Sequence, residues 1–190
     1  MTRNRKGELA LSVMIAVRHG GRVAVAVDSL WASGWEEMRR AEAKLTRRGD
    51  TIVTVGPASG YSDALQRDVL TFIGQHDDWH QQWTEHCLTG PDESAMRRLA
   101  TAEQTDGAPI LVVWRGRIFE VRADGGIFET ADPAEAVGCG RQFAKGAALA
   151  LMPHYSSART IAIKAAEVAC RLSAGCAPPI LCESVRLEGT

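Results

Sequence analysis

Three polar side chains in the first 44 residues could together carry out nucleophilic chemistry. Ser12 supplies a hydroxyl, Asp28 a carboxylate and Lys44 an amine. A serine hydroxyl becomes a nucleophile when a neighbouring group takes its proton, and a lysine whose pKa is lowered or whose amine is oriented by a carboxylate can assist. The alternative is that the three are unrelated, because a serine, an aspartate and a lysine occur by chance in most chains.

The segment 12–28, SVMIAVRHGGRVAVAVD, predicts a β-hairpin that brings Ser12 and Asp28 to the same end. Both arms alternate small and branched apolar residues, and Gly20-Gly21 suits the primed turn of a tight hairpin, which needs positive φ. The turn sets a register in which Val13 faces Asp28. In that register the side chains of Ser12 and Asp28 point to opposite faces, so a twist at the strand end or the side chain of Lys44 must connect them.

The rest of the chain predicts strands, helices, strands, helices and a final strand. The segment 29–40 is expected to be turn-like. Apolar patterns and turn residues predict strands at 44–46, 51–55, 109–114, 118–121, 127–129 and 180–187, and helices from 62, at about 78–88, at 92–102, at 141–152 and from 157. Hairpins dominate, so we expect an α+β fold: a four-layer αββα sandwich of two mainly antiparallel sheets flanked by helix pairs.

Composition narrows the function classes. The chain has 190 residues, of which 45% are hydrophobic and 24% charged, as in an ordinary soluble globular domain. The net charge of −1 gives no reason to expect a nucleic-acid or membrane partner. The basic segment 1–11 lacks the apolar core of a signal peptide, and five cysteines do not predict a disulfide scaffold, so we expect a cytoplasmic protein.

Two other motifs suggest chemistry but fail on detail. Gly138-Cys139-Gly140 before a helix could cradle a phosphate, but Phe143 stands where a dinucleotide fingerprint needs glycine. Lys145 lacks both the preceding glycine and the following serine or threonine of a P-loop. No nucleotide cofactor is therefore expected.

A histidine-rich segment is the one metal-like cluster in the sequence. His76 and His80 are four residues apart and could share a helix face, with further candidate ligands at Asp77, Asp78, His86 and Cys87. Because no third ligand falls at a fixed motif spacing, we expect a solvated helix surface and no metal.

Several of these stretches together resemble the proteasome β-subunit family of N-terminal-nucleophile hydrolases. The likeness is greatest to the peptidase subunit of the bacterial two-component ATP-dependent protease. It is carried by the hairpin 12–28, Lys44-Leu45, TIVTVGPASGYSDA at 51–64, the segment 109–121 and ETADPAEAVGCGRQFAKGAALAL at 129–151, and it continues to residue 169. The polar middle, about 78–105, is similar only loosely.

The resemblance implies roles for specific residues. Ser12 stands at the position of the family's nucleophilic threonine, which becomes the first residue when a propeptide is removed and whose α-amino group then serves as the base. Asp28 and Lys44 match the family's aspartate and lysine. Cys139 matches the serine of a Gly-Ser-Gly turn near the nucleophile, and the backbone N–H of Ser59 matches the oxyanion donor.

The resemblance also implies a domain organisation, substrates and partners. Residues 1–11 would be a propeptide-like leader and residues 12–190 a single αββα domain. The substrate would be a peptide or an unfolded protein, the subunit would form a homo-oligomeric ring, and an ATPase would be a possible partner. No cofactor, metal, nucleic acid or membrane is expected.

The sequence departs from the family pattern at four positions. Ser12 lacks the methyl group that restricts a threonine rotamer, and Leu11 stands where self-processing subunits usually have glycine. Ser59 replaces a usual glycine and Arg171 a usual aspartate. The retained aspartate and lysine favour an active peptidase. Leu11, Ser12 and Arg171 favour an inactive homologue that serves as a structural or binding ring subunit. An amidase for a small molecule is a third alternative.

Overall fold

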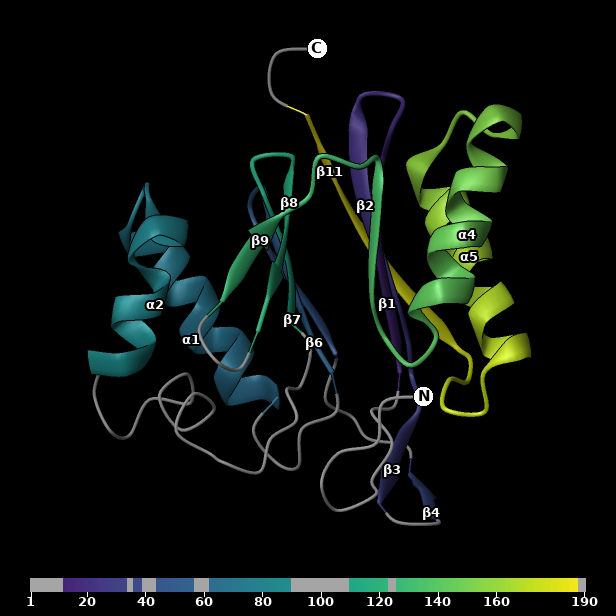
Figure 1. Ribbon diagram of the computed structural model, residues 1–190, viewed down its shortest axis with the longest axis horizontal. Coiled ribbons are helices and arrows are strands. Elements are labelled where there is room, and N and C mark those ends of the chain that lie inside the picture. The colour runs from purple at the N-terminus through teal and green to yellow at the C-terminus, as the bar shows by residue number, and fades with distance from the viewer. Residues whose placement is uncertain are drawn as a thin grey trace.

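The chain folds into four layers, two sheets enclosed between two helix pairs (Figure 1). The computed structural model describes residues 12–33, 36–38, 44–56, 62–89, 110–122 and 126–187. Helices α1 (Ser62–Gln75) and α2 (Trp79–Thr89) cover one sheet. Helices α4 (Arg141–Leu151) and α5 (Ala158–Leu172) cover the other. The predicted αββα sandwich is confirmed.

The predicted hairpin forms the centre of a four-stranded antiparallel sheet. Its strands are β1 (Val13–His19) and β2 (Arg22–Asp28), flanked by β10 (Ala134–Gly138) and β11 (Ile180–Arg186) in the order β10-β1-β2-β11. Gly20 and Gly21 have φ angles of 56° and 70°, as the tight turn requires. The register pairs Met14 with Val27, as the sequence predicts.

The second sheet has five antiparallel strands in chain order. These are β5 (Leu45–Arg48), β6 (Thr51–Val55), β7 (Ile110–Trp114), β8 (Arg117–Val121) and β9 (Ile127–Glu129). Each lies within two residues of a predicted strand. Because β5 begins at Leu45, Lys44 stands immediately before a strand.

The alternation of side chains along β1 separates two apolar layers. Val13, Ile15 and Val17 pack against the alanine-rich faces of α4 and α5, whereas Met14 and Ala16 pack toward the five-stranded sheet. With both faces covered, the strand is apolar from Val13 to Val17. Within the part of the chain described, no helix is both long and apolar enough to cross a membrane.

The turn-like segment predicted at 29–40 contains a small sheet instead. Strand β3 (Trp31–Ser33) pairs antiparallel with β4 (Glu36–Met38). Each strand has three residues, which is too short for a two-residue alternation to be recognised in the sequence. The predicted helix at 92–102 lies outside the described residues.

Candidate active site

The structure brings Ser12, Asp28 and Lys44 together at one end of the β1–β2 hairpin. The Ser12 hydroxyl donates a hydrogen bond to Asp28 Oδ1. Lys44 Nζ lies 3.0 Å from Ser12 Oγ and 3.5 Å from Asp28 Oδ1. None of the three side chains is more than 1% exposed. A buried hydroxyl between an amine and a carboxylate is an arrangement suited to proton transfer from the hydroxyl.

The contact between Ser12 and Asp28 is direct, which corrects the expectation that they point to opposite faces. Ser12 has a φ of 85°, in the left-handed region that residues other than glycine rarely adopt. Strand β1 begins one residue later, at Val13, so the strand alternation does not apply to Ser12. The left-handed backbone therefore turns the hydroxyl back toward the end of β2.

Asp28 is held in place by backbone donors as well as by Ser12. The N–H of Val13 donates to Oδ1 at 2.9 Å, and the N–H groups of Leu30 and Ala177 donate to Oδ2, each at 3.1 Å. Hydrogen bonds to an ionised carboxylate are stronger than neutral ones. The carboxylate is thus oriented by three separate stretches of chain and can fix the hydroxyl of Ser12.

Burial lowers the pKa of Lys44 below 10.5, partly opposed by the charge of Asp28 and a hydrogen bond to it. Its amine also donates to the carbonyl oxygen of Leu30. Lys44 is therefore closer to its neutral form than an exposed lysine, and its amine is aimed at Ser12 Oγ.

The backbone of Ser12 is held from two sides. Its N–H donates to the carbonyl of Gly175 at 2.6 Å, and its own carbonyl accepts from the N–H of Gly140 at 3.3 Å and from the Cys139 thiol at 3.4 Å. Cys139 therefore lies beside Ser12, in contact with its backbone carbonyl. Ser59 lies outside the described residues.

The loop 173–177 between α5 and β11 is a part of the site that sequence reasoning missed. It supplies the Gly175 acceptor for Ser12 and the Ala177 donor for Asp28. Gly175 and the prolines that follow indicate a turn, but nothing in the sequence indicates that the turn packs beside Ser12.

Cys139 also belongs to a close group of polar and sulfur atoms. Its Sγ lies 3.6 Å from the Sγ of Cys176 and 3.3 Å from the hydroxyl of Ser173. The hydrogen bond from Cys176, helped by Ser173 and opposed by burial, lowers the pKa of Cys139 to about 6. The same hydrogen bond, together with burial, raises the pKa of Cys176. Of the two thiols, Cys139 is therefore the more acidic.

Gly140 lets the site pack tightly at this point. A Cβ added there would lie 2.8 Å from Cys176 Sγ and 2.9 Å from the Cβ of Val13. A larger residue would therefore separate the first turn of α4 from Ser12 and from the loop after α5.

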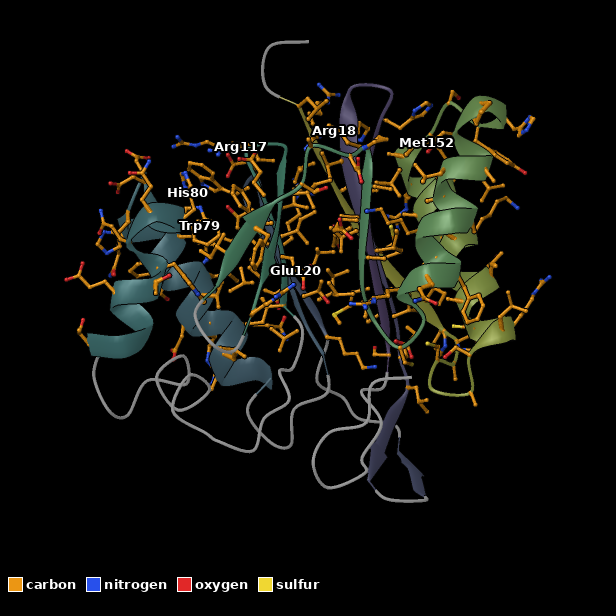
Figure 2. The ribbon with its side chains drawn as sticks, in the orientation of Figure 1. Arg18, Trp79, His80, Arg117, Glu120 and Met152 are labelled. Carbon is orange, nitrogen blue, oxygen red and sulfur yellow. The ribbon has the colours of Figure 1, made fainter. Side chains whose placement is uncertain are left out.

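The histidine-rich segment is arranged differently from what its spacing predicts. His76 follows the end of α1 and His80 lies on α2, so the two do not share a helix. Trp79 is fully buried, and the His80 ring lies 5.5 Å from that of Phe119, on the side of α2 that faces the five-stranded sheet (Figure 2). The expectation of a solvated surface is thus wrong for Trp79 and His80. The structure does not describe the side chains of His86 and Cys87. Among the residues that it does describe, no three metal-ligating side chains form a group.

The sequence matches no protein-family model. The fold, in contrast, is shared with solved structures. HslV from Trypanosoma brucei superposes with a TM-score of 0.75 at 23% identity, over 92% of this chain and 99% of that one. BPH from Thiobacillus denitrificans in complex with epoxomicin gives a TM-score of 0.67 at 19% identity, over 93% of this chain and 99% of that one. A second BPH structure gives 0.66 at 20% identity, over 94% and 100%.

These matches span nearly the whole chain. They agree with the four layers and with the resemblance read from the sequence. Sequence identities of 19–23% support a conclusion about the fold alone. The protein shares its four-layer fold with HslV and BPH, which is the N-terminal-nucleophile hydrolase fold expected from the sequence.

Proposed function

We propose that this protein is a proteasome-like peptidase whose nucleophile is Ser12 after residues 1–11 have been removed. The observation that carries the proposal is the buried contact of Ser12 Oγ with both Asp28 and Lys44. The shared fold with HslV supports it at the level of architecture.

The first step of the proposal is cleavage of the bond between Leu11 and Ser12. Ser12 Oγ attacks the Leu11 carbonyl carbon, the C–N bond breaks as an ester forms, and the hydroxyl proton passes to the Ser12 nitrogen. Water then hydrolyses the ester, which releases residues 1–11 and frees the α-amino group of Ser12. The left-handed φ of Ser12 supports this step, because strained backbone costs about 1–3 kcal/mol and is concentrated at reactive sites.

The second step is hydrolysis of a substrate peptide bond. An α-amino group has a pKa of about 7.7–8.0, so it can take the proton of Ser12 Oγ near neutral pH. The oxygen attacks the scissile carbonyl, and the amine product leaves with that proton. Water then releases the acyl group and restores the hydroxyl.

Lys44 and Asp28 have different parts in this scheme. Lys44 donates to Ser12 Oγ and stabilises negative charge that develops on the oxygen. Asp28 orients the hydroxyl and compensates the buried ammonium, and the backbone N–H of Ser59 is proposed as a donor to the oxyanion. Cys139, which contacts the Ser12 carbonyl, positions the nucleophile.

The proposal extends to assembly and location. We propose a homo-oligomeric ring that acts on peptides or unfolded proteins in the cytoplasm, with an ATPase as partner. Light scattering on the purified protein tests the ring, which requires a mass several times that of one chain.

Intact mass and N-terminal sequencing of the incubated full-length protein, together with hydrolysis of a fluorogenic peptide, test the function. We expect a species that begins at Ser12 and hydrolysis that falls at least about 1,000-fold in Ser12→Ala, which remains full-length. Ser156→Ala, at an exposed serine, is the matched control and should behave as wild type. A chain that stays full-length and inactive after long incubation would contradict the proposal and favour the inactive ring subunit.

A further inference from the structure

Cys139 and Cys176 come from distant parts of the sequence and contact each other beside the backbone of Ser12. Cys139 lies in the turn between β10 and α4, and Cys176 lies in the loop after α5. Their sulfurs are 3.6 Å apart, and the cysteines that the structure describes are all free thiols. We propose that this pair is a modification site, at which a hydroperoxide reversibly converts the two thiols to a disulfide.

The geometry suits a two-step oxidation. A disulfide bond is about 2.05 Å long, so the sulfurs must approach by about 1.5 Å. Cys139 is partly exposed, which admits a small oxidant, whereas Cys176 is only 5% exposed. Cys139 is therefore the thiol that reacts first with the peroxide, and Cys176 is the protected thiol that resolves the product.

The chemistry balances with the peroxide as oxidant. The Cys139 thiolate attacks one peroxide oxygen, the O–O bond breaks, and Cys139 becomes a sulfenic acid as hydroxide or alkoxide leaves. The Cys176 thiol then attacks the Cys139 sulfur, an S–S bond forms and water departs. The two thiols lose two electrons and two protons, and the peroxide takes up both. A thiol reductant reverses the reaction.

The other described cysteines are poorer targets. Burial raises the pKa of Cys170 and of Cys182 to about 11. At neutral pH only about one such thiol in ten thousand is ionised, and the thiolate is the reactive form. We expect Cys139 to oxidise at least about tenfold faster than either, once the lower nucleophilicity of an acidic thiol is allowed for.

Closure of the disulfide would move the groups that hold Ser12. Gly140, next to Cys139, donates to the Ser12 carbonyl, and Gly175, next to Cys176, accepts from the Ser12 N–H. Drawing the two cysteines together therefore shifts both contacts. Misplacement of a nucleophile by about 1 Å can cost about 100-fold in rate. This consequence rests on the proposed function, whereas the disulfide itself does not.

The test treats the full-length protein with hydrogen peroxide and then alkylates it in denaturant without reduction. We expect the intact mass measured before alkylation to fall by two hydrogen atoms, and peptide mapping of the alkylated sample to find Cys139 linked to Cys176. Dithiothreitol should reverse both changes. Cys176→Ser should form no such link, and its Cys139 should gain one oxygen and be trapped by dimedone. Cys182→Ser, a matched change at another buried thiol, should keep the link.

The wild-type map needs no variant, so a folding defect in Cys176→Ser leaves the test intact. The proposal is overturned if Cys139 and Cys176 remain alkylatable while other thiols are oxidised, or if either pairs with a third cysteine. Peptide hydrolysis measured on the same samples separates the two proposals. A disulfide in a protein that hydrolyses nothing when reduced refutes only the peptidase, and an active protein without the disulfide refutes only the thiol pair.

Discussion

Replacing Asp28 by asparagine should remove about 3–6 kcal/mol from the free energy of unfolding. The carboxylate has two acceptor oxygens. Oδ1 accepts from the Val13 N–H and the Ser12 hydroxyl, and Oδ2 accepts from the N–H groups of Leu30 and Ala177. Asparagine has only one acceptor oxygen, so its NH₂ group, which cannot accept, must replace the other oxygen and face the N–H or O–H donors there.

The size of the effect follows from the two hydrogen bonds that are lost. If the remaining oxygen stays with Ser12, the N–H groups of Leu30 and Ala177 are left without their acceptor in a fully buried site. Hydrogen bonds to charged groups contribute about 1.5–3 kcal/mol each, which gives the range above. Lys44 also loses its charged partner, which adds to the cost.

Urea unfolding followed by tryptophan fluorescence measures the change, because Trp79 and Trp83 are buried. With a slope of about 1–3 kcal/mol per molar urea, the midpoint should fall by at least about 1 M. Asp132→Asn is the matched control: that carboxylate is 61% exposed and pairs with Lys145, so its loss should cost less than about 0.5 kcal/mol. Equal midpoints for the two variants would refute the role of Asp28 as the centre of the hydrogen-bond network.

Three further predictions concern neighbouring groups. The alkylation rate of Cys139 by iodoacetamide should rise with pH around a midpoint near 6. Cys182 should stay unreactive in that range, because burial raises its pKa to about 11. Equal pH profiles for the two thiols would exclude a special environment for Cys139. Burial lowers the pKa of Lys44 in the folded protein below its unfolded value of 10.5. Between these two pKa values the unfolded chain binds more protons than the folded chain, so the free energy of unfolding rises with pH in that range. The stability of wild type relative to Lys44→Met, compared by urea unfolding, should therefore increase as the pH is raised toward 10.5, and a decrease would show that the sign is wrong. Gly140→Ala should lower the free energy of unfolding by about 1–3 kcal/mol, because its Cβ would meet Cys176 Sγ at 2.8 Å, and an unchanged urea midpoint would show that the packing there can relax.

Much of the fold could be predicted because its signals are local. The Gly20-Gly21 turn and the alternating arms define the β1–β2 hairpin and its register. Most other strands and helices begin and end within a few residues of their apolar patterns, whereas the strand list read from the sequence does not include β10. The exceptions have local reasons too. Strands β3 and β4 are too short to show a period, and His80 is polar in sequence but its ring contacts buried aromatic rings.

The candidate site also has features that local sequence signals predict and features that they do not. By itself the sequence determined the residue types, their order, and the hairpin that carries Ser12 and Asp28 to one end. Only the tertiary structure decided that they touch, because the left-handed backbone of Ser12 overrides the strand alternation. The loop 173–177 reaches Ser12 and Asp28 through the packing of α5 on the sheet. No local pattern encodes that packing, because a contact between distant segments depends on how whole layers fit together.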